Sequence, residues 1–305
     1  MSQRTGINYV DVSWNPIVMR CTPVSDACTF CWHLAMCKRH AANPFLSEEL
    51  RAARGGGPPV LIEKELNAPM RWRKPRKVAV QFMGDLWHPD VDFADVTAVF
   101  DAMCSWRWPS KAAARKGDES QLVDPGHTFF VLTKRPERIL SWLNWVDERW
   151  PGESPFQQKR EHHGGIPPHI LMGVTAENQE WLEKRWKYLS QIPTRLWLSL
   201  EPLLGPCDLD TPYSPGVHAL GCGGDCDCQP KVSFVVIGCE SGPGRRPCKD
   251  EWALDLLDQC WEAQVPVWLK QFEINGRVEH DANVLAAHFG TTTELIRQLP
   301  KEMNK

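Results

Sequence analysis

Three cysteines close to the amino end of the chain have types and spacing suited to metal chemistry. Cys21, Cys28 and Cys31 form a C-x6-C-x2-C pattern. Thiolates bind zinc and iron–sulfur clusters, and a four-iron cluster held by three thiolates keeps one iron free for a small ligand. The alternative is a structural site in which Cys28 and Cys31 are half of a zinc centre. The triplet predicts a metal centre with one open coordination position.

A second group of cysteines lies in a Gly-rich stretch, residues 206–230. Cys222, Cys226 and Cys228 follow Cys207 within this stretch. Because no apolar leader precedes residue 20, we expect a reducing compartment, in which grouped cysteines hold metals more often than disulfides. The stretch predicts a zinc ion or an auxiliary cluster, and the alternative is a surface loop with free thiols.

The composition is that of an ordinary folded protein. The 305 residues are 42% hydrophobic and 24% charged, with a formal net charge of −3. This charge argues against a generally basic nucleic-acid-binding surface, although a local basic patch remains compatible with it. No apolar stretch is long enough to span a membrane, so we expect a cytoplasmic protein with no membrane partner.

The elements that position these cysteines alternate between short apolar strands and amphipathic helices. Such alternation predicts a parallel sheet covered by helices, and about six to seven strands fit a partial or near-complete (β/α) barrel. No GxGxxG follows the first strand, which argues against a dinucleotide-binding fold. The predicted strands are 7–12, 78–83, 129–132, 170–174, 196–200, 232–237 and 267–269, and the predicted helices 93–104, 136–145, 178–189 and 252–263.

Polar residues stand at or just beyond the carboxyl ends of these predicted strands. In a β/α barrel those ends form the face on which ligands bind. We therefore expect a polar rim around one site. A hydrolase that uses Glu177 and Glu201 as an acid/base pair is an alternative for such a rim, but it leaves the cysteine triplet unexplained. The rim candidates are Gly84, Asp85, Thr133, Lys134, Thr175, Glu177, Ser199, Glu201, Gly238, Glu240, Ser241 and Lys270.

The segment from Cys28 to Cys31, with Phe30 between them, resembles the C-x-aromatic-C end of the radical S-adenosylmethionine (SAM) signature. Most of residues 5–273 also resembles a phage-associated, three-Cys-motif family of radical-SAM-like proteins. The first cysteine gap is six residues here and three in the commonest radical SAM loop. A second departure is Cys239, where the family tends to have glycine. Further matching segments are Trp14-Asn15-Pro16, Leu132-Thr133-Lys134-Arg135-Pro136, Gly173-Val174-Thr175-Ala176-Glu177 and Ser199-Leu200-Glu201-Pro202.

The resemblance implies a radical SAM enzyme. Cys21, Cys28 and Cys31 would hold a [4Fe–4S] cluster that cleaves SAM and generates a 5′-deoxyadenosyl radical. It implies a barrel over residues 1–275 with a Cys-rich insertion at 206–230, and a C-terminal helical extension over 276–305. Lys270, Glu201 and Glu177 are the expected catalytic residues. The expected cofactor-binding residues are Phe30, Gly84, Asp85, Thr133, Lys134, Thr175, Ser199, Gly238, Glu240 and Ser241.

The phage setting implied by the resemblance also suggests partners. Together with the basic segment 71–77 and the rim cations, it fits a nucleic-acid base or nucleotide as substrate, for modification or repair. The residues are equally compatible with a peptide substrate, and a solvated or structural role is the stronger alternative for segment 71–77. A flavodoxin- or ferredoxin-like electron donor would reduce the cluster in the host cytoplasm. A non-catalytic, zinc-stabilised nucleic-acid-binding protein is the alternative from a different functional class.

Overall fold

The computed structural model describes residues 5–105, 111–116, 123–124, 126–149, 154–210, 219–220 and 232–303. Cys222, Cys226 and Cys228 lie outside these described residues. The strands are β1 (Val12–Trp14), β2 (Ile17–Val18), β3 (Val60–Leu61), β4 (Lys77–Val80), β5 (Thr128–Thr133), β6 (Ile170–Thr175), β7 (Leu196–Leu200), β8 (Val232–Gly238), β9 (Val267–Ile274) and β10 (Arg277–Glu279).

The helices alternate with the strands as the sequence pattern predicts. Four of the described helices begin at side-chain caps, in which a side-chain oxygen accepts from the backbone of the first turn. These caps are Ser47 for α2, Ser154 for α8, Asn178 for α9 and Asp281 for α11. The helices are α1 (Trp32–Ala41), α2 (Glu48–Gly55), α3 (Glu63–Leu66), α4 (Ala68–Arg71), α5 (Phe93–Cys104), α6 (Lys111–Lys116), α7 (Glu137–Arg149), α8 (Pro155–His163), α9 (Gln179–Leu189), α10 (Asp250–Glu262), α11 (Ala282–His288) and α12 (Thr293–Ile296).

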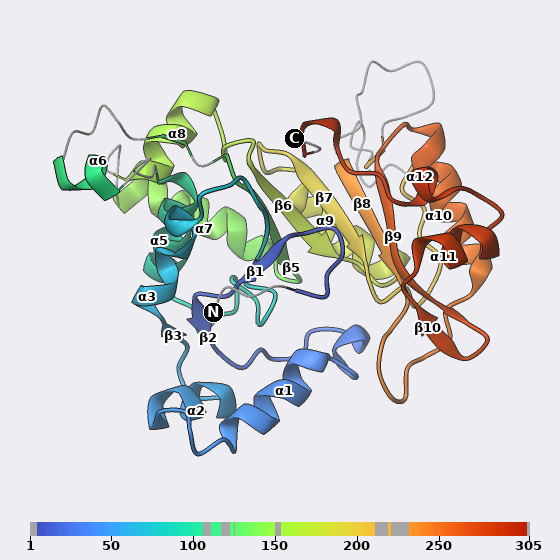
Figure 1. The fold of residues 1–305 in the computed structure, drawn as a ribbon, viewed down its shortest axis with the longest axis horizontal. Helices are drawn as coiled ribbons and strands as arrows, with labels where there is room; N and C mark the ends of the chain where they lie inside the picture. Colours follow the sequence, from blue (N-terminus) through green and yellow to red (C-terminus); the bar gives the residue numbers. More distant parts are fainter. Residues whose placement is uncertain are drawn as a thin grey trace.

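The main sheet is a curled, open half-barrel (Figure 1). Its eight strands follow the order β1-β4-β5-β6-β7-β8-β9-β10. The pairs from β1 to β9 are all parallel, and β10 returns antiparallel to β9. Seven parallel strands in an open sheet confirm the predicted partial (β/α) barrel.

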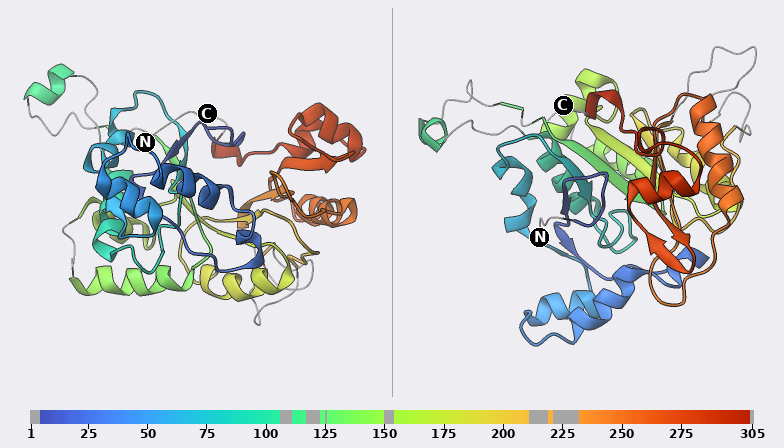
Figure 2. Two further views of the ribbon diagram at one scale, coloured as in Figure 1. Left: turned by 90° about the horizontal axis from the view of Figure 1, so that it is seen from below. Right: turned by 45° about the vertical axis from the view of Figure 1, so that its right-hand side comes forward.

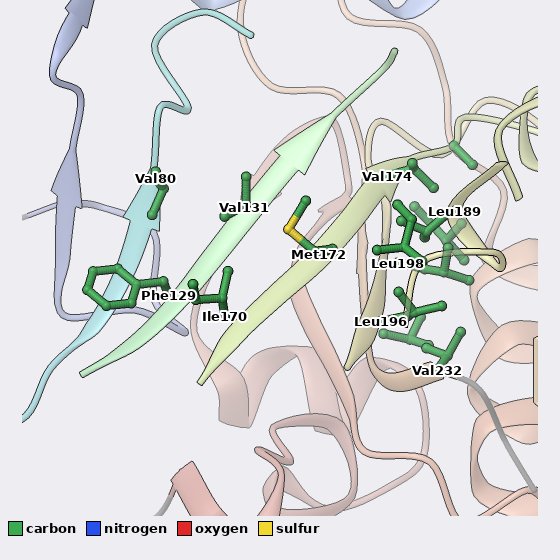
Figure 3. Packing of buried hydrophobic residues seen from close by; sticks show 14 of the residues in the cluster. Val80, Phe129, Val131, Ile170, Met172, Val174, Leu189, Leu196, Leu198 and Val232 are labelled. Atoms are coloured by element: carbon green, nitrogen blue, oxygen red, sulfur yellow. The ribbon is translucent and has the colours of Figure 1, made fainter. Parts of the chain in front are cut away.

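The convex face of the sheet packs against the helices. Alternate side chains of β5 to β8 point outward, and they are apolar because this face is sealed from water. Figure 3 shows several of them, including Phe129, Val131, Met172 and Leu198, which are buried in one continuous cluster. In the left view of Figure 2, α7 and α9 lie side by side across the base of this layer.

The concave face carries aromatic side chains instead. Trp197 lies in the middle of β7 and packs against Phe130 and Phe234 of neighbouring strands. Gly173 on β6 makes room for it, because a Cβ atom there would lie 2.4 Å from Trp197 Nε1. The indole nitrogen donates to the Val131 carbonyl at 3.1 Å. These rings fill part of the concave side of the half-barrel. They leave the space at the carboxyl ends of the strands open.

The strand predicted at residues 7–12 is wrong, because β1 covers only Val12–Trp14. The preceding residues instead run from β1 to β9 across the open side of the half-barrel. Asn8 donates to the Lys270 carbonyl at 3.3 Å and accepts from Trp268 Nε1 at 2.8 Å. Tyr9 enters the concave face and is only 2% exposed. The residues before β1 thus shield the inner face of the open sheet from water. Their apolar pattern resembles that of a strand.

A small lobe projects from the main body near the amino end (Figure 1). It contains the helix pair α1 and α2, beside the two-stranded sheet of β2 and β3. At the other end of the chain, β10, α11 and α12 pack near β9. Within the described residues, no helix has the length and apolar character needed to cross a membrane.

Candidate functional site

A cavity of about 290 Å³ opens at the carboxyl ends of the parallel strands. This volume is near the lower end of small-molecule sites, roughly 300–1,000 Å³. The cavity wall combines residues from the loop that carries the cysteine triplet with residues from the ends of β4 to β9. It brings together these predicted residues: Cys21, Cys28, Phe30, Cys31, Gly84, Asp85, Thr133, Lys134, Thr175, Ser199, Glu201, Glu240, Ser241 and Lys270.

The cysteine triplet occupies the loop between β2 and α1. A 3₁₀ turn at Asp26–Cys28 closes through the Cys28 amide, which donates to Ser25 O at 2.9 Å. Cys31 then occupies the N-cap position of α1. All three thiols are partly exposed and face the cavity. Among the described residues, no three His, Cys, Asp or Glu side chains are grouped so that they would hold a single metal ion.

The pKa values of two of these thiols, Cys21 and Cys28, are shifted in opposite directions. Burial raises the pKa of Cys21 to about 11, and the nearby Asp85 charge adds to this effect. Burial also acts on Cys28, but the Lys134 ammonium and hydrogen bonds from the loop outweigh it and lower the pKa of that thiol. Because the thiolate is the nucleophile and the metal ligand, Cys28 is the more readily activated of the two.

Asp85 and Arg135 form the central polar contact below the cysteine loop. Arg135 Nη1 donates to Asp85 Oδ2 at 2.8 Å and approaches Cys21 Sγ at 3.6 Å. Its Nη2 atom donates to both the carbonyl and the hydroxyl oxygen of Thr22 at 2.9 Å. Asp85 also accepts from the Thr133 hydroxyl at 2.7 Å. Asp85 is thus engaged by protein donors, and this group of contacts holds Cys21 in place against β5.

Glu177 lies behind the cavity wall and does not contact the cavity. It is fully buried, and its carboxylate lies 3.4 Å from Lys134 Nζ and 2.6 Å from Arg185 Nη1. These two cations lower the pKa of Glu177 although burial opposes them. The Lys134 ammonium also donates to Ser25 Oγ at 3.3 Å. Glu177 therefore positions Lys134 beside the cysteine loop.

Glu201 and Lys270 form an ion pair inside the cavity. Lys270 Nζ lies 2.9 Å from Glu201 Oε1, and Ser199 Oγ donates to Glu201 Oε2 at 3.2 Å. Gly238 does not line the cavity, but a Cβ atom there would lie 2.7 Å from Glu201 Oε1. Burial and the Glu201 charge together raise the pKa of Tyr9, which forms part of the cavity floor. This end of the cavity contains a carboxylate and an ammonium able to exchange a proton.

Glu240 connects the end of β8 to the cysteine loop through Arg246. The Arg246 guanidinium donates to Glu240 Oε1 at 2.6 Å and to the Asp26 carbonyl at 3.0 Å. It also lies over the ring of Phe30, 5.5 Å from the centroid. Arg245 is bound in turn by Glu273. Both arginines are thus ion-paired within the protein.

Other predicted residues lie away from the cavity. Cys207 is buried in the apolar core, where burial raises the pKa of its thiol to about 12, and its three suggested partners fall outside the described residues. The basic segment 71–77 leads into the amino end of β4, opposite the cavity. There Arg76 lies over the ring of Trp72 at 5.7 Å from the centroid.

Tyr9 and Trp32 line the cavity but were not singled out from the sequence. Arg135 belongs to a segment that matches the family, and it anchors the cysteine loop at the cavity. Lys134 and Arg135 are adjacent in the chain, and both reach the cavity wall. Trp32 could have been predicted as a cavity residue, because it directly follows the last cysteine of the triplet.

Comparison with known proteins adds a family but no activity. A search of curated proteins and a search of solved structures each gave no match. One family model, described as "protein of unknown function (DUF5131)", matches residues 4–110 and 119–294. These ranges include the cysteine loop and every element that surrounds the cavity. The chain therefore belongs to the DUF5131 family.

Proposed function

We propose that this protein is a radical SAM enzyme whose cysteine triplet holds a [4Fe–4S] cluster. The observation that carries the proposal is the convergence of Cys21, Cys28 and Cys31 on one cavity at the carboxyl ends of the parallel strands. These ends form the ligand-binding face of β/α barrels. The sequence resemblance to radical-SAM-like proteins agrees with this placement.

The donor set fits such a cluster. Three thiols on one loop match the ligand count of a four-iron cluster that keeps one iron free of protein ligands. In such a cluster each thiolate would bind a different iron, and this agrees with the finding that the three thiols are not grouped as the ligands of a single ion. Lys134 lowers the pKa of the Cys28 thiol and so favours the thiolate that binds metal.

The chain's own residues have defined tasks in this proposal. When bound, the cluster would supply the electron that cleaves SAM into methionine and a 5′-deoxyadenosyl radical. Lys134, held by Glu177 and Ser25, offers an ammonium for the SAM carboxylate. The apolar side chains of Phe82 and Leu132 line the same cavity and exclude water from part of it. Arg135 holds the Cys21 side of the loop in place.

At the other side of the cavity, Glu201 and Lys270 form an ion pair, with 2.9 Å between Lys270 Nζ and Glu201 Oε1. Ser199 orients the carboxylate through its second oxygen. In the proposal this pair binds the substrate and exchanges a proton with it.

The proposal includes partners and a compartment. Reduction of the cluster requires a one-electron donor, for which a flavodoxin- or ferredoxin-like protein is the proposed class. A reducing cytoplasm would keep the thiols free for the cluster. The proposed substrate is a nucleic-acid base or a nucleotide.

Anaerobic reconstitution with ferrous iron and sulfide tests the cluster. We expect a brown protein with about four irons per chain, which forms 5′-deoxyadenosine from SAM after reduction. Cys21→Ala, Cys28→Ala and Cys31→Ala should each lose the cluster and the product. Cys248→Ala is the matched control, because Cys248 is also partly exposed but does not line the cavity. A colourless protein that carries only zinc would overturn the proposal and favour the nucleic-acid-binding alternative.

A further inference from the structure

Exposed aromatic side chains are confined to one region of the described chain. Phe30, Trp32 and Phe45 are 42%, 53% and 95% exposed, whereas the other described Phe and Trp side chains are buried or half-buried. All three belong to the cysteine loop or to the lobe formed by α1 and α2. Phe30 and Trp32 also line the cavity. Exposed rings beside a cavity mark a surface that binds a partner.

Helix α1 presents a face on which the aromatic ring is followed by cations. Trp32, Lys38 and Arg39 are exposed, whereas His33 and Cys37 are buried against the rest of the lobe. Trp32 and Arg39 are seven residues apart, so they lie on the same side of the helix. The indole at the cavity and the Arg39 charge thus lie on one side of α1, and the exposed Lys38 lies next to Arg39 at the edge of that side.

The charge of this region has the opposite sign to that of the whole chain. Residues 20–54 contain five Lys and Arg and three Asp and Glu, in a chain of net charge −3. Among the cations, Arg54 is buried, where it donates to the Met19 carbonyl at 3.0 Å. Lys38, Arg39 and Arg20 are on the surface. The exposed acids Asp26, Glu48 and Glu49 lie elsewhere in the sequence of this region, and α1 itself carries the exposed cations Lys38 and Arg39 next to the exposed aromatic rings.

We propose that α1 binds an unpaired nucleic-acid strand, with one base stacked on Trp32 at the cavity mouth and phosphates at Lys38 and Arg39. Single-strand sites combine cations along the backbone with aromatic rings on which bases stack. The inference rests on the proposed function in one respect, because it takes a base of this strand as the substrate group that enters the cavity.

The dimensions of the face agree with a short strand. Seven residues of helix rise by about 10 Å. A stacked strand advances by about 3.4 Å per nucleotide, so this length covers roughly three nucleotides. Phe30, which lies under Arg246, provides a second ring at the cavity.

Fluorescence anisotropy with a labelled 12-nucleotide single strand tests the inference, using the full chain before and after anaerobic reconstitution. Trp32→Ala should weaken binding roughly 5- to 100-fold, as expected for the loss of one stacked base. Trp32→Phe should restore most of it, which excludes misfolding as the cause. Phe45→Ala is the matched control, because Phe45 is exposed on the same lobe but does not line the cavity.

The cations are tested through salt dependence. Lys38→Ala with Arg39→Ala should reduce the slope of log affinity against log salt by about 0.7 for each lost phosphate contact. Lys184→Ala with Lys187→Ala on α9 should leave the slope unchanged. DNA and RNA strands of one sequence serve as probes, and binding of either supports the inference.

Two results would overturn the inference: Trp32→Ala that binds the strand as tightly as the wild type, or a duplex bound as tightly as the single strand. Failure of the proposed function looks different. In that case the strand binds through Trp32, but reconstitution yields no cluster and no 5′-deoxyadenosine. A cluster with SAM cleavage but no strand binding would instead refute this inference alone.

Discussion

The guanidinium of Arg135 and the carboxylate of Asp85 form a buried ion pair of 2.8 Å that supports the cysteine loop. Arg135 follows β5 and Asp85 follows β4, so the pair joins the ends of adjacent strands. The same guanidinium donates two hydrogen bonds to Thr22. The position of Cys21 beside the cavity thus depends on a charge pair whose members are fifty residues apart.

Asp85→Asn should strongly destabilise the protein. The change leaves the Arg135 charge buried without its partner, which typically costs about 3–5 kcal/mol. Urea denaturation measures this loss. Asp90→Asn is the control, since that carboxylate is 65% exposed and its removal should change stability by less than about 0.5 kcal/mol. If both variants lowered the free energy of unfolding by the same amount, the ion pair of Asp85 and Arg135 would not be buried.

Glu177 should make stability depend on pH in the acid range. Burial opposes ionisation, but Lys134 and Arg185 outweigh it and hold the pKa of Glu177 below its ordinary value of 4.5. The folded protein therefore binds this proton less readily than the unfolded chain does. The resulting stabilisation is present above pH 4.5 and is lost as the pH falls through the lower pKa of the folded state.

Urea denaturation of the wild type and Glu177→Gln from pH 7 to pH 3 checks this prediction. The two free energies of unfolding should differ most near neutral pH and converge toward acid. A difference that stays constant over this range would contradict the assignment of Glu177 as a charged partner of Lys134 and Arg185.

Two cysteines of the triplet should differ in reactivity when no metal is bound. The pKa of Cys21 is about 11, and that of Cys28 lies below its ordinary value because of Lys134 and the loop hydrogen bonds, although burial opposes them. At pH 8, iodoacetamide should alkylate Cys28 faster than Cys21, as mass spectrometry of timed samples can measure. Lys134→Gln should slow the Cys28 reaction, and Lys249→Gln, on an exposed side chain, should not. Equal rates for the two thiols would contradict the prediction.

Gly173→Ala should destabilise the concave face. A Cβ atom there would lie 2.4 Å from Trp197 Nε1, so the buried indole must move. Such overpacking costs about 1–3 kcal/mol, visible as a lower midpoint in thermal unfolding. Gly55→Ala is the control, because nothing lies within 4 Å of a Cβ atom at that helix end. A Gly173→Ala protein as stable as this control would show that Trp197 moves without cost.

Much of the architecture could be predicted from local patterns. The alternation of apolar strands with amphipathic helices identified the parallel sheet, and β7 and α5 have their predicted bounds. The rim residues could also be predicted, since a polar side chain directly after a buried strand must lie at the carboxyl edge of the sheet. The strand expected at residues 7–12 was the exception, because a segment that shields the open sheet and a strand share an apolar pattern.

The residue types at the strand ends and the three cysteines of one loop can be read directly from the amino-acid order. The contacts of each charged side chain follow from the folded arrangement instead. Glu177 and Glu201 are equivalent in the sequence pattern, yet one is sealed between two cations and the other faces the cavity. The reason is physical: ion pairs such as Glu201 with Lys270 form between residues far apart in the chain. Local periodicity predicts which face of a strand is buried. It does not predict which side chain from a distant part of the chain contacts that strand.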